Sequence, residues 1–139
     1  MNYSNEHSSV GVRSRVLIVD DDEDLRDIVA LTLSSCGYAC EVAPGAAAAE
    51  ELLDQQPFDV VISDLRMRGM SGLELLDRVK RSHPELPFII MTGSTRPHES
   101  TDAAGRGAFE YLVKPCDTEE VQRAVANAIR RDDSSSARA

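Results

Sequence analysis

Short runs of apolar residues that alternate with longer stretches of helical spacing constrain the fold of this chain more than any other feature. The runs cover residues 16–19, 60–62, 88–91 and 111–113. A strand without polar alternation is covered on both of its faces, so these runs predict buried strands. Between them, apolar residues recur three and four positions apart, which predicts amphipathic crossover helices. The alternation therefore predicts an α/β protein with a parallel sheet.

A weaker strand is predicted at residues 39–42. It follows Gly37, a residue type that suits a helix C-terminus, and it precedes Pro44 and Gly45, where the next helix opens. With this strand the sheet has five members.

Three helices are predicted in the second half of the chain. Two of them span residues 71–81 and 118–130, the latter with Thr118 as its N-cap. The stretch 97–107 contains one proline and two glycines, which weaken a helix, so we expect a short and mobile helix there. Five strands alternating with five helices predict a doubly wound sheet.

The length of 139 residues accommodates one compact domain and is too short for two ordinary ones. We expect a flexible segment at residues 1–14, a folded domain at 15–131 and a disordered polar tail at 132–139. No output domain is expected within this sequence.

The composition argues against several classes of function. A net charge of -9 disfavours direct binding to nucleic acid, which requires clustered cations. The three cysteines, Cys36, Cys40 and Cys116, lack the paired spacing of a disulfide framework or a zinc site. Neither a signal-peptide core nor an apolar run of roughly 20 residues is present, so no membrane partner and a cytoplasmic protein are expected.

Polar residues follow four of the five predicted strands. They are Asp20, Asp21, Asp64, Thr92 and Lys114. Because the carboxyl ends of parallel strands meet at one edge of a sheet, these side chains are expected to converge there. Carboxylates brought together repel one another and need a counter-charge, most naturally a hard cation with oxygen ligands. Mg²⁺ is the physiological candidate.

Each of these residues also has an ordinary structural interpretation. The acidic run 20–24 could be a solvated surface that favours a helix N-terminus, and Asp64 could be a turn residue. Lys114 could be a surface lysine, and Tyr111 a half-buried strand aromatic with a solvated hydroxyl. The combination, rather than any single residue, points to a site.

Four segments carry a pattern that resembles the receiver domains of response regulators in bacterial two-component signalling. They are residues 17–22 (LIVDDD), 60–67 (VVISDLRM), 91–93 (MTG) and 111–115 (YLVKP). Their order and spacing are specific as a set, and the likeness covers roughly residues 15–130. The resemblance implies a flavodoxin-like (βα)5 fold with strand order 2-1-3-4-5.

The resemblance also implies how phosphate and metal would be bound. Asp64 would accept a phosphoryl group from a phosphohistidine. Asp20, Asp21 and Asp64 would hold Mg²⁺ together with the backbone carbonyl of Arg66. Lys114 would supply a cation to the phosphoryl oxygens.

Further residues would transmit the phosphorylated state. Thr92 and the backbone N–H of Gly93 would contact the phosphoryl group, and Tyr111 would rotate in response. The bond between Lys114 and Pro115 would be cis, as is typical of this family.

The variable positions Arg66 and Ser94 would flank the phosphate and influence its hydrolysis. This chain also departs from many relatives in having Arg68 where they carry proline.

The partners implied are a histidine kinase or phosphotransfer protein and a downstream protein target. A homodimer through the last two helix-strand elements is also expected. The chain would be a signalling phosphoacceptor rather than an enzyme, catalysing only its own phosphorylation and dephosphorylation.

Two other functions are compatible with parts of this pattern. A small Mg²⁺-dependent phosphohydrolase would use the same acids but needs a substrate pocket, for which the short connections leave little chain. A phosphorylation-independent interaction module would not need the complete set of Asp, Thr and Lys positions.

Overall fold

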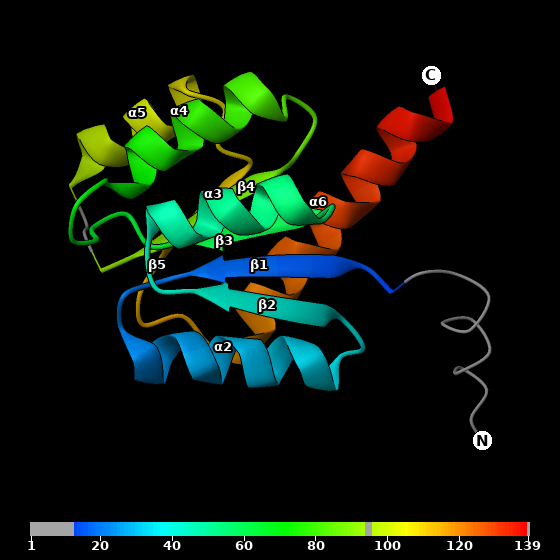
Figure 1. Ribbon diagram of the computed structural model, residues 1–139, viewed down its shortest axis with the longest axis horizontal. Helices are drawn as coiled ribbons and strands as arrows, with labels where there is room; N and C mark the ends of the chain where they lie inside the picture. The colour runs from blue at the N-terminus through cyan, green and yellow to red at the C-terminus, as the bar shows by residue number, and fades with distance from the viewer. Residues whose placement is uncertain (1–12, 94–95, 139) are drawn as a thin grey trace.

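Five strands and five helices alternate along the chain (Figure 1). The computed structural model describes residues 13–93 and 96–138, so most of the segment 1–14 and the position of Ser94 lie outside the described residues. The strands are β1 (Arg15–Val19), β2 (Ala39–Ala43), β3 (Val60–Ser63), β4 (Phe88–Thr92) and β5 (Glu110–Val113). The helices are α2 (Glu23–Ser35), α3 (Ala46–Gln55), α4 (Gly72–Ser82), α5 (Pro97–Gly105) and α6 (Thr118–Arg138).

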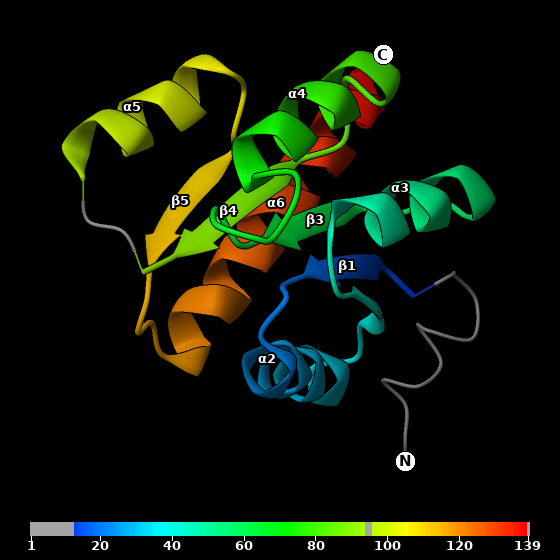
Figure 2. The same cartoon turned by 60° about the vertical axis from the view of Figure 1, so that its left-hand side comes forward.

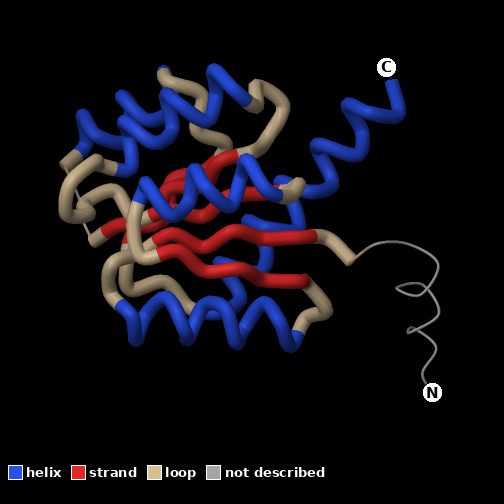
Figure 3. The backbone as a smooth tube through the Cα atoms, in the orientation of Figure 1, coloured by secondary structure: helices blue, strands red, loops and turns tan. Residues whose placement is uncertain are grey.

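The sheet is parallel throughout and has the order β2-β1-β3-β4-β5, as predicted. Helices α3, α4 and α5 cover one face, and α2 and α6 cover the other (Figures 1 and 2). All strands therefore end at the same edge, where they run into the loops at the left of Figure 3.

Burial on both faces explains why β1, β3 and β4 lack polar alternation. The prediction of a fully buried strand was wrong for β5, because it lies at the edge of the sheet and Val113 is 41% exposed. In β1, Val16 and Ile18 pack with α2 and α6, whereas Leu17 and Val19 pack with α3 and α4, and all four are at most 1% exposed. The same alternation in β3 and β4 produces two apolar cores, one on each side of the sheet. Burial of apolar surface on this scale is the main source of folding free energy.

Side chains cap the helices that follow the strand ends. Asp22 accepts a hydrogen bond from the backbone N–H of Leu25 at the start of α2. Ser71 and Glu74 form a reciprocal capping box at the start of α4. These caps determine where each loop returns to helix.

Two predictions about α6 are wrong. Asp117, rather than Thr118, caps the helix, because its carboxylate accepts from the N–H of Glu120 while Glu120 accepts from the N–H of Asp117. The helix also continues to Arg138, although its end was predicted at Arg130. Residues 131–138 contain no glycine or proline that would stop a helix.

The stretch 97–107, where a short helix was predicted, contains α5 at Pro97–Gly105. Pro97 lies in its first turn, where a missing N–H costs nothing. Among the helices within the described ranges, none is long and apolar enough to cross a membrane.

Candidate functional site

The ends of β1 and β3 place three aspartates at the carboxyl edge of the sheet. The backbone N–H of Asp20 donates to Ala43 at 3.1 Å, and that of Asp64 donates to Val19 at 2.9 Å. These bonds extend the sheet ladders one residue beyond the strands and hold both aspartates at the edge. Asp20 is almost completely buried, at 2% exposure.

The three carboxylates converge as the sequence predicted. Asp20, Asp21 and Asp64 each offer one oxygen, and these oxygens lie within 4.8 Å of one another. Oxygen donors at this spacing and of this charge suit a hard divalent cation such as Mg²⁺. The donor set therefore fits the metal that the sequence pattern implies.

Lys114 reaches the same place from the end of β5. Its ammonium Nζ lies 3.2 Å from Asp20 Oδ2 and 3.5 Å from Asp64 Oδ2. The peptide bond to Pro115 is cis, and the backbone N–H of Lys114 donates to the carbonyl of Thr92 at 2.6 Å. Two of the three carboxylates thus share one ammonium group, which leaves an excess of negative charge.

The pKa of Asp64 is raised above its ordinary value. Burial is the largest cause, and the neighbouring charge of Asp20 acts in the same direction. The ammonium of Lys114 and the backbone N–H groups of Arg66 and Leu65 lower the pKa and offset part of this effect. The nearby positive charge and N–H groups therefore do not fully offset the cost of burying the ionised Asp64 carboxylate. A further cation bound beside it would offset that cost.

The predicted switch residues lie on the two neighbouring strands. Thr92 ends β4 and is 1% exposed, and Gly93 follows it at the surface. Tyr111 on β5 is paired in register with Ile90 of β4 and packs, half-buried, against the core under α3, α4 and α5.

Two arginines after Asp64 make contacts that the sequence did not reveal. The Arg66 guanidinium pairs with Glu99 on α5, with Nη2 and Oε2 2.5 Å apart. The backbone N–H of Arg68 donates to Asp21 Oδ2 at 3.2 Å, and its Nε lies 3.8 Å from the same oxygen. The unusual residue type at position 68 was a usable signal, whereas nothing in the sequence pointed to Glu99.

A glycine on α4 was also missed. Gly72 donates its N–H to the carbonyl of Leu65 at 2.8 Å, and a Cβ built on it would lie 2.2 Å from the carbonyl oxygen of Asp64. Only a residue without a side chain permits so close an approach. The start of α4 thereby supports the loop that carries Asp64.

An apolar cavity of about 360 Å³ lies between α2 and the segment that joins β5 to α6. Leu25, Ile28, Pro115 and Val121 are among its lining residues, and Lys114 borders it. Ile28 and the neighbouring Leu31 are 56% and 72% exposed, which is unusual for large apolar residues on a helix.

Comparison with protein families assigns most of the chain to one model. The response regulator receiver domain matches residues 16–126.

Curated relatives include the DNA-binding transcriptional regulator NtrC of Escherichia coli, which is 40% identical over 117 residues. This match covers 84% of the chain and 25% of NtrC. The response regulator protein PilR of Pseudomonas aeruginosa is 34% identical over 118 residues, which cover 85% of the chain and 26% of PilR. The chain thus spans about a quarter of the length of the curated relatives it matches.

Solved structures give the same result. The receiver domain of NtrX from Brucella abortus superposes with a TM-score of 0.80 at 32% identity, covering 83% of the chain and 98% of that domain. The chemotaxis protein CheY4 of Vibrio cholerae gives 0.81 at 30% identity, covering 84% and 99%.

Proposed function

The chain belongs to the response regulator receiver domain family, and we propose that it accepts a phosphoryl group on Asp64 from a phosphohistidine. The observation that carries the proposal is the convergence of Asp64 with Asp20, Asp21 and Lys114 at one edge of the sheet. A carboxylate at a strand end is ordinary by itself. A carboxylate that lies beside two other carboxylates and one ammonium group is suited to receive a phosphoryl group.

The transfer exchanges one bond for another. A carboxylate oxygen of Asp64 attacks phosphorus, the P–N bond to the donor histidine breaks, and its electron pair returns to the imidazole nitrogen. The product is an aspartyl phosphate, which hydrolysis by water returns to aspartate and phosphate. The ammonium of Lys114, already 3.5 Å from Asp64, stabilises negative charge on the phosphoryl oxygens. The chain is thus a signalling phosphoacceptor that acts on itself.

Mg²⁺ would be held by Asp20, Asp21 and Asp64 together with the backbone carbonyl of Arg66. When bound, it supplies positive charge that neutralises both the carboxylates and the phosphoryl oxygens. Asp20 and Asp21 would hold this charge in place, and the backbone N–H groups of Leu65 and Arg66 favour the ionised form of Asp64 by lowering its pKa.

Thr92, Gly93 and Tyr111 would pass on the phosphorylated state. The hydroxyl of Thr92 and the N–H of Gly93 would donate hydrogen bonds to phosphoryl oxygens, and Tyr111 would rotate toward the space that Thr92 leaves. The position of Thr92 supports this role, because it ends the strand between Asp64 and Lys114 and its carbonyl accepts the Lys114 N–H. A phosphoryl group adds about -1.5 to -2 charges, which is enough to create such bonds.

A histidine kinase or phosphotransfer protein would deliver the phosphoryl group. The apolar cavity beside Lys114 and the exposed Ile28 and Leu31 on α2 support docking of an apolar protein surface next to the site. A downstream protein, or a second copy of the chain, would bind the surface of α5, β5 and α6, where Val113 is 41% exposed. We place the protein in the cytoplasm, and we propose no direct contact of this segment with nucleic acid or membrane.

Incubation with acetyl phosphate or phosphoramidate and Mg²⁺ separates this function from its alternatives. An acid-labile adduct that is absent from Asp64→Ala supports the phosphoacceptor. Multiple turnover on diverse phosphate esters would favour the phosphohydrolase instead. The absence of an adduct with any donor would exclude the leading function and favour the phosphorylation-independent module.

A further inference from the structure

Few apolar contacts attach helix α5 to the rest of the molecule. Within residues 98–105, Ala103 is the one buried residue. The helix lies over the end of the sheet that is formed by β5, at the periphery of the molecule (Figure 2). Because so little apolar surface holds α5, polar contacts at its two ends contribute an unusually large share of its attachment.

One polar contact at the start of α5 is the ion pair between Glu99 and Arg66. The Glu99 side chain is only 12% exposed, whereas that of Arg66 is 56% exposed. A carboxylate so far removed from water needs a counter-charge, and Arg66 supplies one. This pair joins the first turn of α5 to the loop that follows Asp64.

The contact at the end of α5 is independent of the site. Arg106 pairs with Asp77 on α4 at 2.8 Å and with Asp102 on α5 at 2.9 Å. Neither pair includes a residue of the loop that follows Asp64. Of these ion pairs, the one between Glu99 and Arg66 is therefore the one that a change at Asp64 can affect directly.

Arg66 is coupled to Asp64 through the loop that carries both. Only Leu65 separates the two residues, and the Arg66 guanidinium extends to Glu99. A phosphoryl group on Asp64 would put about two negative charges within reach of the same loop, against the single charge of Glu99. Guanidinium groups bind phosphoryl oxygens in bidentate geometry, so the two anions would compete for Arg66.

We propose that Glu99 is a positioning residue that holds the Arg66 guanidinium away from Asp64, so that phosphorylation breaks the Arg66–Glu99 ion pair and releases the first turn of α5. This inference rests on the proposed function. Because the Arg66–Glu99 ion pair must be broken, Glu99 makes phosphorylation less favourable. Arg66 is the residue that links the phosphoryl group to α5.

The test uses beryllofluoride, a non-covalent analogue of the phosphoryl group, with Mg²⁺. Its affinity is measured by calorimetry for the unmodified chain, Glu99→Gln, Arg66→Gln and the double variant. Glu99→Gln should bind about fivefold more tightly, because the ion pair no longer has to be broken. In the Arg66→Gln background the same change should alter affinity by less than about twofold, since the two residues act as a coupled pair.

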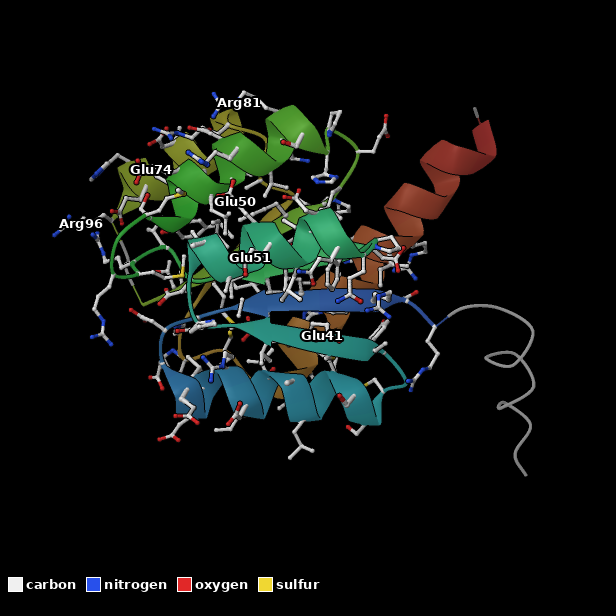
Figure 4. The ribbon with its side chains drawn as sticks, viewed as in Figure 1. Glu41, Glu50, Glu51, Glu74, Arg81 and Arg96 are labelled. Carbon is white, nitrogen blue, oxygen red and sulfur yellow. The ribbon has the colours of Figure 1, made fainter. Side chains whose placement is uncertain are left out.

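The matched control is Glu50→Gln. Glu50 on α3 faces α4 (Figure 4) and pairs with Arg78 Nε at 2.9 Å, and neither residue belongs to the candidate site. Its replacement should leave beryllofluoride affinity unchanged, although it also removes an ion pair between elements.

Hydrogen exchange supplies a readout that does not depend on ligand affinity. Amides 101–104 of α5, which bond to the carbonyls of its first turn, should exchange faster in unliganded Glu99→Gln, and beryllofluoride should produce the same change in the unmodified chain. Equal affinity of Glu99→Gln and the unmodified chain would overturn the inference while leaving the proposed function intact. Failure of every variant to bind beryllofluoride would overturn both.

Discussion

A single ammonium group, that of Lys114, lies between two carboxylates at the candidate site. It is 3.2 Å from Asp20 and 3.5 Å from Asp64, and Asp21 adds a third negative charge to the cluster. The Asp21 carboxylate lies 3.8 Å from the exposed Arg68 guanidinium, so the cluster still holds more negative than positive charge at its buried side. We propose that a divalent cation compensates this remaining charge.

Lys114→Ala should slow phosphorylation by phosphoramidate about 100-fold, because the cation that faces the phosphoryl oxygens is lost. Mg²⁺ affinity should survive, since the carboxylates remain and one competing positive charge is removed. Initial rates and a Mg²⁺ titration check the two expectations. Lys80→Ala, which alters a lysine bonded to the Leu86 carbonyl, is the control. Phosphorylation of Lys114→Ala at the normal rate would refute the role.

Asp64→Asn should raise the free energy of unfolding at neutral pH. The folded-state pKa of Asp64 lies above its unfolded value, mainly through burial, so ionisation of this residue costs folding free energy. That cost grows as pH rises through the folded-state pKa and vanishes below the unfolded pKa. Measured by urea denaturation, the free energy of unfolding of Asp64→Asn should exceed that of the unmodified chain, and this difference should be largest at neutral pH and shrink in acid. A constant difference at every pH would contradict this expectation.

The start of α4 is the element most closely joined to Asp64. Ser71 and Glu74 cap the helix, and Gly72 lies against the Asp64 backbone. The loop between β3 and α4 is thus held at both ends, by the sheet ladder and by the helix. Its position depends on the absence of a side chain at residue 72.

Gly72→Ala should destabilise the fold by about 1–3 kcal/mol and slow phosphorylation, because the new Cβ would displace the Asp64 backbone. Gly105→Ala is the matched control, since a Cβ there meets nothing within 4 Å. It should be neutral or stabilising by about 0.5–1 kcal/mol. Thermal unfolding and phosphorylation rates test both variants, and equal behaviour of the two would show that the close approach does not matter.

The elements differ in how well the sequence predicts them. Strands β1, β3 and β4 each contain an unbroken apolar run with one polar residue at an end, so their position and burial followed directly from residue type. The end of α6 did not follow, because a polar sequence without glycine or proline is compatible with both helix and coil.

The site was predictable only where its residues follow strand ends. Asp20, Asp64 and Lys114 were expected to converge because parallel strands deliver them to one edge. The contact of Arg66 with Glu99 could not be anticipated, since it joins residues 33 positions apart through side chains on a loop and a helix. The approach of Gly72 to Asp64 depends on packing, which no local pattern encodes.

At the scale of the whole molecule, the parallel sheet joins residues from opposite ends of the chain. Asp20 and Lys114 are 94 positions apart in sequence and are in contact only in the folded protein. The metal site therefore does not exist in the unfolded chain. Ligands that bind it stabilise the entire fold by mass action.

Mg²⁺ at about 100 times its dissociation constant should raise the free energy of unfolding by about 2.7 kcal/mol. Asp21→Asn should lose most of this effect, because one of the three carboxylate ligands is removed. Asp54→Asn, on an exposed position of α3, is the control and should respond like the unmodified chain. Calorimetric melting with and without Mg²⁺ makes the comparison, and an unchanged response of Asp21→Asn would place the ion elsewhere.

The central claim is that Asp64 itself carries the phosphoryl group. The chain is treated with phosphoramidate and Mg²⁺, reduced with borohydride, which converts an aspartyl phosphate to homoserine, and digested for peptide mass spectrometry. Homoserine at position 64, absent without phosphoramidate, is the predicted result. Homoserine at Asp20 or Asp21 with position 64 unmodified would contradict the account.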